Sequence, residues 1–379
     1  MERTLAERLI SYDTSRPEGL AQAAGFVKGW LQSRDVDAND HDHKGLPVIT
    51  AEVGPAHGPS VIFHGHLDVV PGHREQFDPR VEGDRLIGRG AYDMKGALAA
   101  MMCGVVDAAA QSRVRVRFLC VPDEESEDVE SHATDALIRE GYGGDFAITG
   151  EPTDMQIGVQ AKGVLAMRIL VGGTAAHSAT PWLGDNAVLK AVDVFRVIES
   201  LPFTRQSSEL FDRPSINLGR IRAGDALNMV PDSCVMDVDV RYLPGQEPEE
   251  ILEQVAQIAD VEVTRTFVRA PAQVSRDDEF IQALGEAVRR TNAGEVMSVG
   301  RDGASDAVAF LQEGIPAVEF GPAGAGHHGP LEWVSISSLA RYRRALGDFV
   351  RQLPERLDWQ RDSDDSPPVR LRALGGGRA

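Results

Sequence analysis

The sequence has few cysteines and no long apolar run. Only three cysteines occur in 379 residues, without Cys-x-x-Cys spacing, which argues against a disulfide framework; we expect Cys103, Cys120 and Cys234 to be buried thiols rather than ligands. No stretch approaches the about 18 consecutive apolar residues of a membrane-spanning helix. The first residues contain no apolar core of signal-peptide length. We therefore expect a cytoplasmic protein.

Positive charge is also scarce. Lysine and arginine total 39 against 58 aspartates and glutamates, which gives a net charge of −19. An excess of negative charge opposes binding to nucleic-acid phosphates and to anionic membranes, so we expect neither as a partner. The hydrophobic content of 42% and the length instead indicate a folded, globular enzyme of about two domains.

Helical and strand-like patterns alternate along the first third of the chain, as in α/β proteins. From about Lys162 the order becomes strand, helix, strand, strand, helix, strand, which is the ferredoxin-like order. We predict a catalytic domain formed by 1–162 and 271–357, with an inserted domain over 163–270. The tail, 358–379, is charged and then rich in proline and glycine, and we expect it to be disordered.

His66 and Asp68 stand just after the apolar run Val61–Phe63, which predicts a buried strand. Because side chains alternate along a strand, these two residues are expected to point the same way. Metal-bound histidines usually donate their second ring N–H to an acceptor, and Asp68 could be that acceptor. A satisfied polar pair without a metal is the structural alternative.

More carboxylates occupy similar positions. Glu124 and Glu125 follow one predicted strand, Glu151 follows another, and Asp93 stands where a glycine-rich loop meets a predicted helix. Ligand sites in open α/β sheets gather at the carboxyl ends of strands. In such a cleft one glutamate could bind a metal while its neighbour transfers protons. The alternatives are a solvated glutamate pair, and an Asp93 that only caps the helix.

A late histidine in a glycine-rich turn, His328, completes a possible ligand set; its neighbour His327 is the alternative. The set contains imidazoles and carboxylates but no thiolate, which suits zinc, manganese or cobalt. Five residues suffice for two metals if Asp93 bridges them, and each metal then keeps an open position, as catalytic sites require. The set is His66, Asp93, Glu125, Glu151 and His328.

Five motifs in this order resemble the zinc amidohydrolase and metallopeptidase family of acetylornithine deacetylase, succinyl-diaminopimelate desuccinylase, carboxypeptidase G and the aminoacylases. They are HGHLDVVPG, GRGAYDMKG, PDEES, GEPT and HHGPLE, and the resemblance extends to about Leu353. It implies a zinc-peptidase-like α/β/α catalytic domain with an inserted ferredoxin-like α+β domain that acts as lid and dimer interface. It also implies two divalent ions, most simply Zn²⁺, with Co²⁺ or Mn²⁺ as alternatives.

The resemblance implies two ligand groups that share one residue. His66, Asp93 and Glu151 would hold one metal, and Asp93, Glu125 and His328 the other. The family pattern of histidine, proline and acid aligns better on His328 than on the preceding histidine.

The resemblance also implies roles for residues that do not bind metal. Asp68 would orient the first histidine, and Glu124 would be the general base. His177, in the inserted domain, would reach the active site across a dimer and polarise the scissile carbonyl. Asn228 and Arg241 match positions that contact substrate, and a strand-end salt bridge is the alternative for Arg241.

We therefore expect a deacylase that hydrolyses the amide of an N-acyl amino acid, with an acetyl or succinyl type of acyl group. A dipeptidase or carboxypeptidase that uses the same site is the alternative, because both reactions cleave an amide beside a carboxylate. A metal-free regulatory protein on the same fold is a more remote one. The expected partners are a small acylated amino acid or dipeptide and a second copy of the chain.

Overall fold

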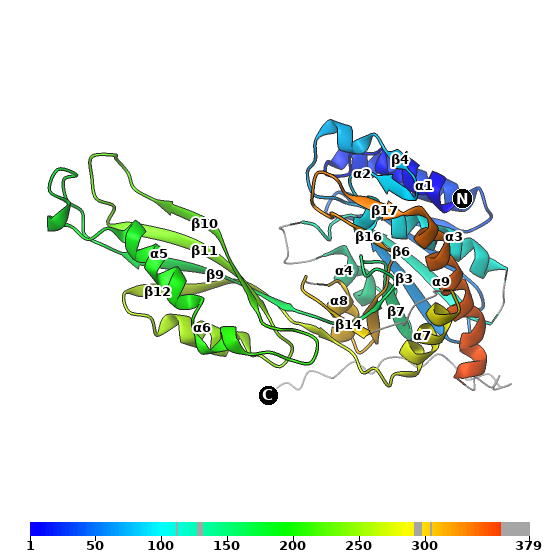
Figure 1. Ribbon diagram of the computed structural model, residues 1–379. Coiled ribbons are helices and arrows are strands. Elements are labelled where there is room, and N and C mark those ends of the chain that lie inside the picture. Colours follow the sequence, from blue (N-terminus) through cyan, green and yellow to red (C-terminus); the bar gives the residue numbers. More distant parts are fainter. Residues whose placement is uncertain (111–112, 127–131, 292–297, 304, 358–379) are drawn as a thin grey trace, which may run out of the picture.

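The computed structural model describes residues 1–110, 113–126, 132–291, 298–303 and 305–357. They form two lobes, a larger one built from both ends of this stretch and a smaller one built from its middle (Figure 1). The tail for which we predict disorder lies outside the described residues. Among the helices in the described part of the chain, none is both long and apolar enough to cross a membrane.

A mixed sheet organises the larger lobe, with the strand order β1-β2-β6-β3-β7-β15-β8-β13 and with β14 also paired to β8. The central strands β6, β3, β7 and β15 run parallel to one another. Parallel strands are covered on both faces, which explains the unbroken apolar run Val61–Phe63. Within the described residues the strands are β1 (Ala38–His43), β2 (Leu46–Val53), β3 (Ser60–His66), β6 (Arg115–Val121), β7 (Phe146–Thr149), β8 (Ile157–Ala161), β13 (Ala272–Gln273), β14 (Ser298–Arg301) and β15 (Ala317–Glu319).

Helices cover both faces of this sheet, which confirms the predicted α/β/α architecture. Because strand side chains alternate, Val61 and Phe63 join the core under one face and Ile62 joins the core under the other. The first face packs against α1 (Glu2–Ile10), α2 (Pro17–Gln32), α3 (Gly96–Ala109), α7 (Glu279–Thr291) and α9 (Ile336–Arg356). The second face packs against α4 (Ala133–Arg139) and α8 (Ala307–Gln312).

A small second sheet in the larger lobe joins two distant parts of the chain. Its order is β16-β17-β5-β4, formed by β4 (Arg80–Glu82), β5 (Arg85–Ile87), β16 (Gly324–Ala325) and β17 (Trp333–Ser335). The turn between β16 and β17 contains His328, and the loop after β5 leads to Asp93. This sheet therefore holds together two segments that carry predicted ligands.

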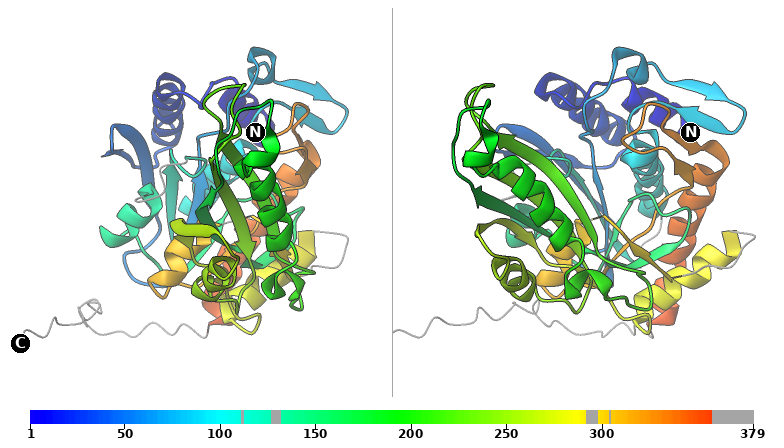
Figure 2. Two further views of the ribbon diagram at one scale, coloured as in Figure 1. Left: turned by 90° about the vertical axis from the view of Figure 1, so that its left-hand side faces the viewer. Right: turned by 60° about the vertical axis from the view of Figure 1, so that its left-hand side comes forward.

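The smaller lobe is the predicted ferredoxin-like unit, and we call it the lid. Its antiparallel order, β10-β11-β9-β12, places both helices on one face of the sheet, where they share a core with its strands (Figures 1 and 2). Its elements are β9 (Gly163–Gly172), α5 (Ala187–Ile198), β10 (Ser215–Ala223), β11 (Ser233–Tyr242), α6 (Pro248–Ala256) and β12 (Val261–Arg269).

The sequence pattern does not reveal the shortest elements. Strands of two or three residues, such as β4, β5, β13 and β16, are too short to show a period, as are the helical turns at 74–77, 181–183 and 202–205. The helix predicted to follow Asp93 begins at Gly96, after a separate turn over Ala91–Lys95. Asp93 lies inside that turn with a non-helical backbone, so it is not the cap of α3. The capping alternative for Asp93 is therefore wrong.

Candidate active site: a cluster of carboxylates and histidines

The predicted ligands meet at one edge of the large sheet. His66 is the last residue of β3, Glu125 follows the neighbouring strand β6, and Glu151 follows β7 on the other side. Because these strands are parallel, their carboxyl ends lie together. The loop before α3 adds Asp93, and the turn between β16 and β17 adds His328.

Asp93 lies between the two histidines. Its Oδ1 lies 3.2 Å from His66 Nε2, and its Oδ2 lies 3.5 Å from His328 Nε2. His328 Nε2 is also 2.9 Å from Glu125 Oε1, and His66 Nε2 is 3.8 Å from Glu151 Oε1. In each of the two predicted triads the ligand atoms lie within 4.8 Å of one another. The geometry therefore brings together the residues expected to hold two ions, with Asp93 common to both.

Glu124 borders the cluster without belonging to either triad that contains Asp93. One of its carboxylate oxygens lies within 4.8 Å of ligand atoms of His66 and Glu125. Burial raises the pKa of Glu124 well above its usual range; His66 opposes this shift, and the charge on Glu125 adds to it. A glutamate with a raised pKa beside the ligands is suited to accept and return a proton near neutral pH.

The donor set fits divalent cations on electrostatic grounds. Glu151 Oε1 is buried and has no hydrogen-bond partner among the described residues. Burial, together with the charge of Asp93, raises the pKa of Glu151 well above its usual range. Four carboxylates converge here on two imidazoles, and such crowding is costly unless positive charge offsets it. Imidazole and carboxylate ligands without thiolate suit zinc, cobalt or manganese.

Asp68 lies beside His66, as the sequence predicts, and its carboxylate makes further contacts. The nearest oxygen to His66 Nδ1 is the Asp68 main-chain carbonyl at 3.0 Å, whereas the side-chain Oδ1 is 3.5 Å away. The carboxylate accepts hydrogen bonds from the backbone N–H groups of Glu125 at 2.8 Å and Glu124 at 3.3 Å. The strand ends at His66, so the alternation argument does not extend to Asp68. Both the main-chain carbonyl and the carboxylate of Asp68 therefore lie near His66 Nδ1, and the carboxylate also fixes the loop with the two glutamates.

Sequence reasoning assigned no role to Glu332, although it belongs to a recognised motif. Its buried carboxylate accepts hydrogen bonds from the backbone N–H groups of Gly90, Tyr92 and Asp93, at 2.9, 3.0 and 3.0 Å. It also forms an ion pair with Arg89 at 2.9 Å. These contacts hold the loop that presents Asp93. An acid in the same motif as a ligand was the only signal in the sequence.

The structure distinguishes the two adjacent histidines. His328 faces the cluster, whereas the ring of His327 lies against Tyr92, with 6.0 Å between ring centroids. His328 adopts a positive φ of 60°, and it belongs to one of the ligand groups. The geometry favours His328 as the ligand.

The predicted lid residues lie apart from this cluster. His177 and Asn228 are exposed neighbours on the lid: Ser178 N–H donates to the Asn228 carbonyl at 3.0 Å, and Ala179 N–H donates to His177 Nδ1 at 3.0 Å. Arg241 forms an ion pair with Asp239 at 2.8 Å, the salt bridge considered as its alternative. Among the described contacts, none joins these three residues to the metal-ligand cluster.

Replacing Glu332 with glutamine should weaken metal binding without unfolding the chain. Glutamine keeps the size of the side chain, but its amide NH₂ would face backbone donors that need an acceptor. We expect a loss of affinity of about 10- to 100-fold, typical of residues that orient ligands. Titration with Zn²⁺ against a competing chelator measures it, with exposed Glu313→Gln as the control. Equal affinity in the two variants would contradict this role.

Metal binding should release protons, so affinity should rise with pH. Hydrogen bonds to Asp93 and Glu125 raise the pKa of His328 to about 10 in the metal-free cluster. An ion must therefore displace a proton from this imidazole, and each displaced proton changes affinity roughly tenfold per pH unit. Calorimetry between about pH 6 and 8, in buffers of different ionisation enthalpy, counts the protons. His327→Asn should leave the count unchanged, and binding without proton release would refute the expectation.

Comparison with known proteins agrees with this geometry. Succinyl-diaminopimelate desuccinylase from Gluconobacter oxydans (strain 621H) is 30% identical over 328 residues, which cover 80% of this chain and 84% of that enzyme. The M20 family metallo-carboxypeptidase Sso-CP2 from Sulfolobus solfataricus superposes with a TM-score of 0.77 at 20% identity, covering 93% of this chain and 99% of that one.

A second solved structure is the YXEP protein of Bacillus subtilis, described as a dinuclear metal binding peptidase from the M20 family. It has a TM-score of 0.67 at 17% identity and covers 93% of this chain and 99% of its own. The model of peptidase family M20/M25/M40 matches residues 62–352. The chain belongs to this family and is a metal-dependent amide hydrolase.

Proposed function

We propose that this enzyme hydrolyses the amide bond of an N-acyl amino acid, with Glu124 as the general base. The observation that carries the proposal is the position of Glu124 next to His66 and Glu125 but outside both triads that share Asp93. A carboxylate that is not needed as a ligand keeps an oxygen for proton transfer.

The proposed cofactors are two divalent ions, with Zn²⁺ as the first choice and Co²⁺ or Mn²⁺ as alternatives. His66, Asp93 and Glu151 would hold one ion, and Asp93, Glu125 and His328 the other. Ions of this kind lower the pKa of a bound water from about 15.7 toward about 7.

Glu124 is proposed to take a proton from the attacking water and to return it to the leaving nitrogen. Its raised pKa matches both halves of this task, because the group must give up the proton as readily as it accepts it. Asp68 supports this proton transfer by accepting hydrogen bonds from the backbone N–H groups of Glu124 and Glu125, which fixes their position. The products are a free amine and a carboxylate.

The proposed substrate carries an acetyl or succinyl type of acyl group on an amino acid. The similarity of about 30% to desuccinylases supports a substrate with a carboxylate near the scissile amide. Arg241 would bind that carboxylate, because the planar guanidinium of arginine pairs with carboxylates through two parallel hydrogen bonds. Asn228 would add a polar contact. Substrate would have to displace Asp239 from Arg241.

We further propose a homodimer formed through the lid, in which His177 serves the active site of the other copy. His177 is exposed and has no described contact with the cluster of its own chain. Helix α5 of the lid also exposes Leu189 (65%), Val192 (37%) and Val197 (44%). Exposed apolar side chains of this kind are suited to contact with a second copy. His177 would polarise the scissile carbonyl, and a lost oxyanion donor costs about 3–4 kcal/mol of barrier.

A substrate panel tests the reaction class. We expect release of free amine from N-acetyl, N-succinyl or N-formyl amino acids by enzyme loaded with zinc, cobalt or manganese, and loss of activity with EDTA that returns on adding metal. Dipeptides in the same panel test the alternative, a dipeptidase or carboxypeptidase. Preference for dipeptides would replace the deacylase proposal, and activity that EDTA leaves intact would refute the metal-dependent mechanism.

The two adjacent glutamates should differ when each is replaced by alanine. Glu124→Ala should retain both metals and lose turnover by about 10²- to 10⁴-fold, the usual contribution of a general base. Glu125→Ala should lose metal affinity, because it removes a ligand of one triad. Metal analysis after dialysis and initial rates measure both, with exposed Glu140→Ala as the control. Full activity of Glu124→Ala at normal metal content would refute its role.

A further inference from the structure

The chain passes between the two lobes at one narrow place. β8 leads through Lys162 into β9 of the lid, and β12 leads through 270–271 back into β13. The two crossings lie side by side: Arg269 pairs with Val164 on the lid side, and Ala272 pairs with Ala161 on the catalytic side. Figure 1 shows the rest of the lid extending away from this junction. The junction therefore has the form of a two-stranded hinge.

Each crossing carries a largely covered cation, Lys162 or Arg269, that pairs with an aspartate just after β14. Arg269 Nη2 lies 2.7 Å from Asp306 Oδ1, and the two side chains are 15% and 1% exposed. Lys162 Nζ lies 2.7 Å from Asp302 Oδ1 and donates to the Arg213 carbonyl at 2.8 Å. Both aspartates follow β14. Of the two ion pairs, that of Arg269 is the better shielded from solvent, since Asp302 is 84% exposed.

Asp306 links this hinge to the floor of the active site. Its Oδ2 accepts a hydrogen bond from Thr134 Oγ1 at 2.9 Å and lies 3.4 Å from Nε2 of His64, a buried residue of β3 two positions before His66. Burial opposes ionisation of Asp306, but contacts with His132, Arg269 and His64 hold its pKa well below the usual range. Arg269 therefore ends on a charged carboxylate that belongs to the core of the catalytic domain.

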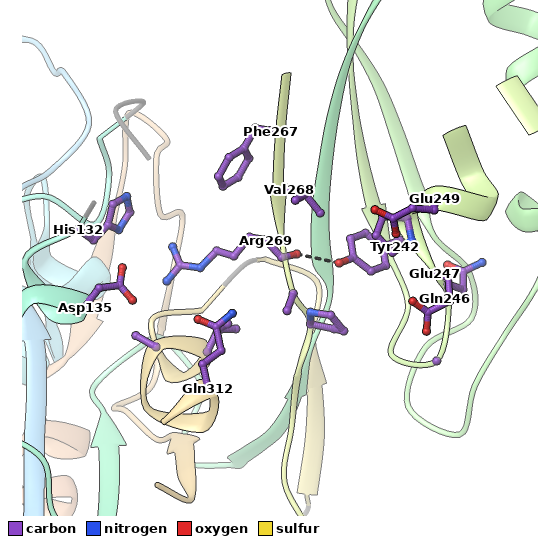
Figure 3. A pocket seen from close by; sticks show the side chains of 16 residues that line it. His132, Asp135, Tyr242, Gln246, Glu247, Glu249, Phe267, Val268, Arg269 and Gln312 are labelled. Carbon is purple, nitrogen blue, oxygen red and sulfur yellow. Dashed lines mark hydrogen bonds between the residues drawn. The ribbon is translucent and has the colours of Figure 1, made fainter. Parts of the chain in front are cut away.

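Beside this link the two lobes are separated by a cavity of about 500 Å³. The lid turn 245–249 lines one side of it and α8 lines the other (Figure 3). The Arg269 side chain extends from β12 toward the catalytic domain (Figure 3). Tyr242 Oη donates a hydrogen bond to the Arg269 carbonyl at 3.0 Å, which joins β11 to β12 at this residue (Figure 3). Side chains do not pack across this cavity, so the lid is restrained here by the polar contacts of Arg269 beside it.

We propose that Arg269 is a positioning residue of the hinge, and that its ion pair with Asp306 sets the angle of the lid over the metal-ligand cluster. The angle decides how Arg241 approaches the substrate and how His177 reaches the active site of the other copy, so this part of the proposal rests on the proposed function. The effect of the ion pair on the lid angle itself does not depend on the proposed function. Removing Arg269 takes from Asp306 the cation that the lid strand supplies, so the hinge should lose its preferred angle.

Distance measurements between spin labels test the hinge directly. Labels are attached at Gln22→Cys on α2 and Glu199→Cys at the end of α5, two exposed positions, and the native cysteines are buried. The labelled protein is mixed with an excess of unlabelled protein, so that the measured distances join two labels in the same copy rather than labels in two copies. The full chain, loaded with Zn²⁺, is compared as wild type, Arg269→Gln and Arg269→Lys.

Arg265→Gln is the matched control, because Arg265 also lies on β12 but pairs with Glu249 at 2.7 Å on the surface of the lid. Arg269→Gln should broaden or shift the distance distribution, Arg269→Lys should restore most of it, and Arg265→Gln should match wild type. Circular dichroism verifies that each variant is folded. A distribution for folded Arg269→Gln that coincides with wild type would overturn the proposal.

Kinetics with the substrate found in the panel give the second measurement. Arg269→Gln should keep its metal content and lose kcat/KM by about 10- to 10²-fold, since small displacements of substrate-binding groups have effects of this size. Lysine should recover part of the loss. If wild type hydrolyses no member of the panel, the proposed function fails while the distance measurement still decides the hinge. If distances change but kcat/KM does not, the positioning role is refuted.

Discussion

The concentration of negative charge at one edge of a parallel sheet is the constraint on which this structure depends. Parallel strands bring the residues that follow them to the same place, and here those residues are acids. Asp93 offers one oxygen to each histidine. Such an arrangement persists only where the surrounding backbone holds it and where cations offset its repulsion. Glu332 and Asp68 stabilise the arrangement because their carboxylates accept hydrogen bonds from backbone N–H groups on either side of the cluster.

Glu332 and Asp68 explain how loops can position so many of the candidate ligands, because both acids accept hydrogen bonds from the backbone of these loops. Loops alone position catalytic side chains imprecisely. Each hydrogen bond to a backbone N–H of the loop restricts the conformation of the ligand residue beside it. Glu332 arrives from a segment far from Asp93 in the sequence, joined to it by the small sheet β16-β17-β5-β4. The metal-ligand cluster is therefore assembled from both ends of the catalytic domain, and neither end forms it alone.

The sequence predicts the ligands better than it predicts their supports. His66, Glu125 and Glu151 follow apolar runs whose strand character is readable, and parallel strands must bring them together. The sequence places Asp68 beside His66, but it does not predict that the Asp68 carboxylate also accepts hydrogen bonds from the backbone N–H groups of Glu124 and Glu125. Contacts such as Arg269 with Asp306 join residues whose spacing has no pattern, so only three-dimensional structure reveals them.

The pairing of Ala161 with Ala272 has a consequence for how this enzyme is built. The lid leaves the large sheet from β8 and returns at β13, the strand paired with it, so its two ends meet where a short hairpin would otherwise stand. The free-energy cost of closing a loop rises slowly with its length, so the sheet tolerates a long insertion here. A different lid could replace this one without changing a single strand of the catalytic core. The inserted domain can therefore change in evolution while the strands that position the candidate ligands stay as they are.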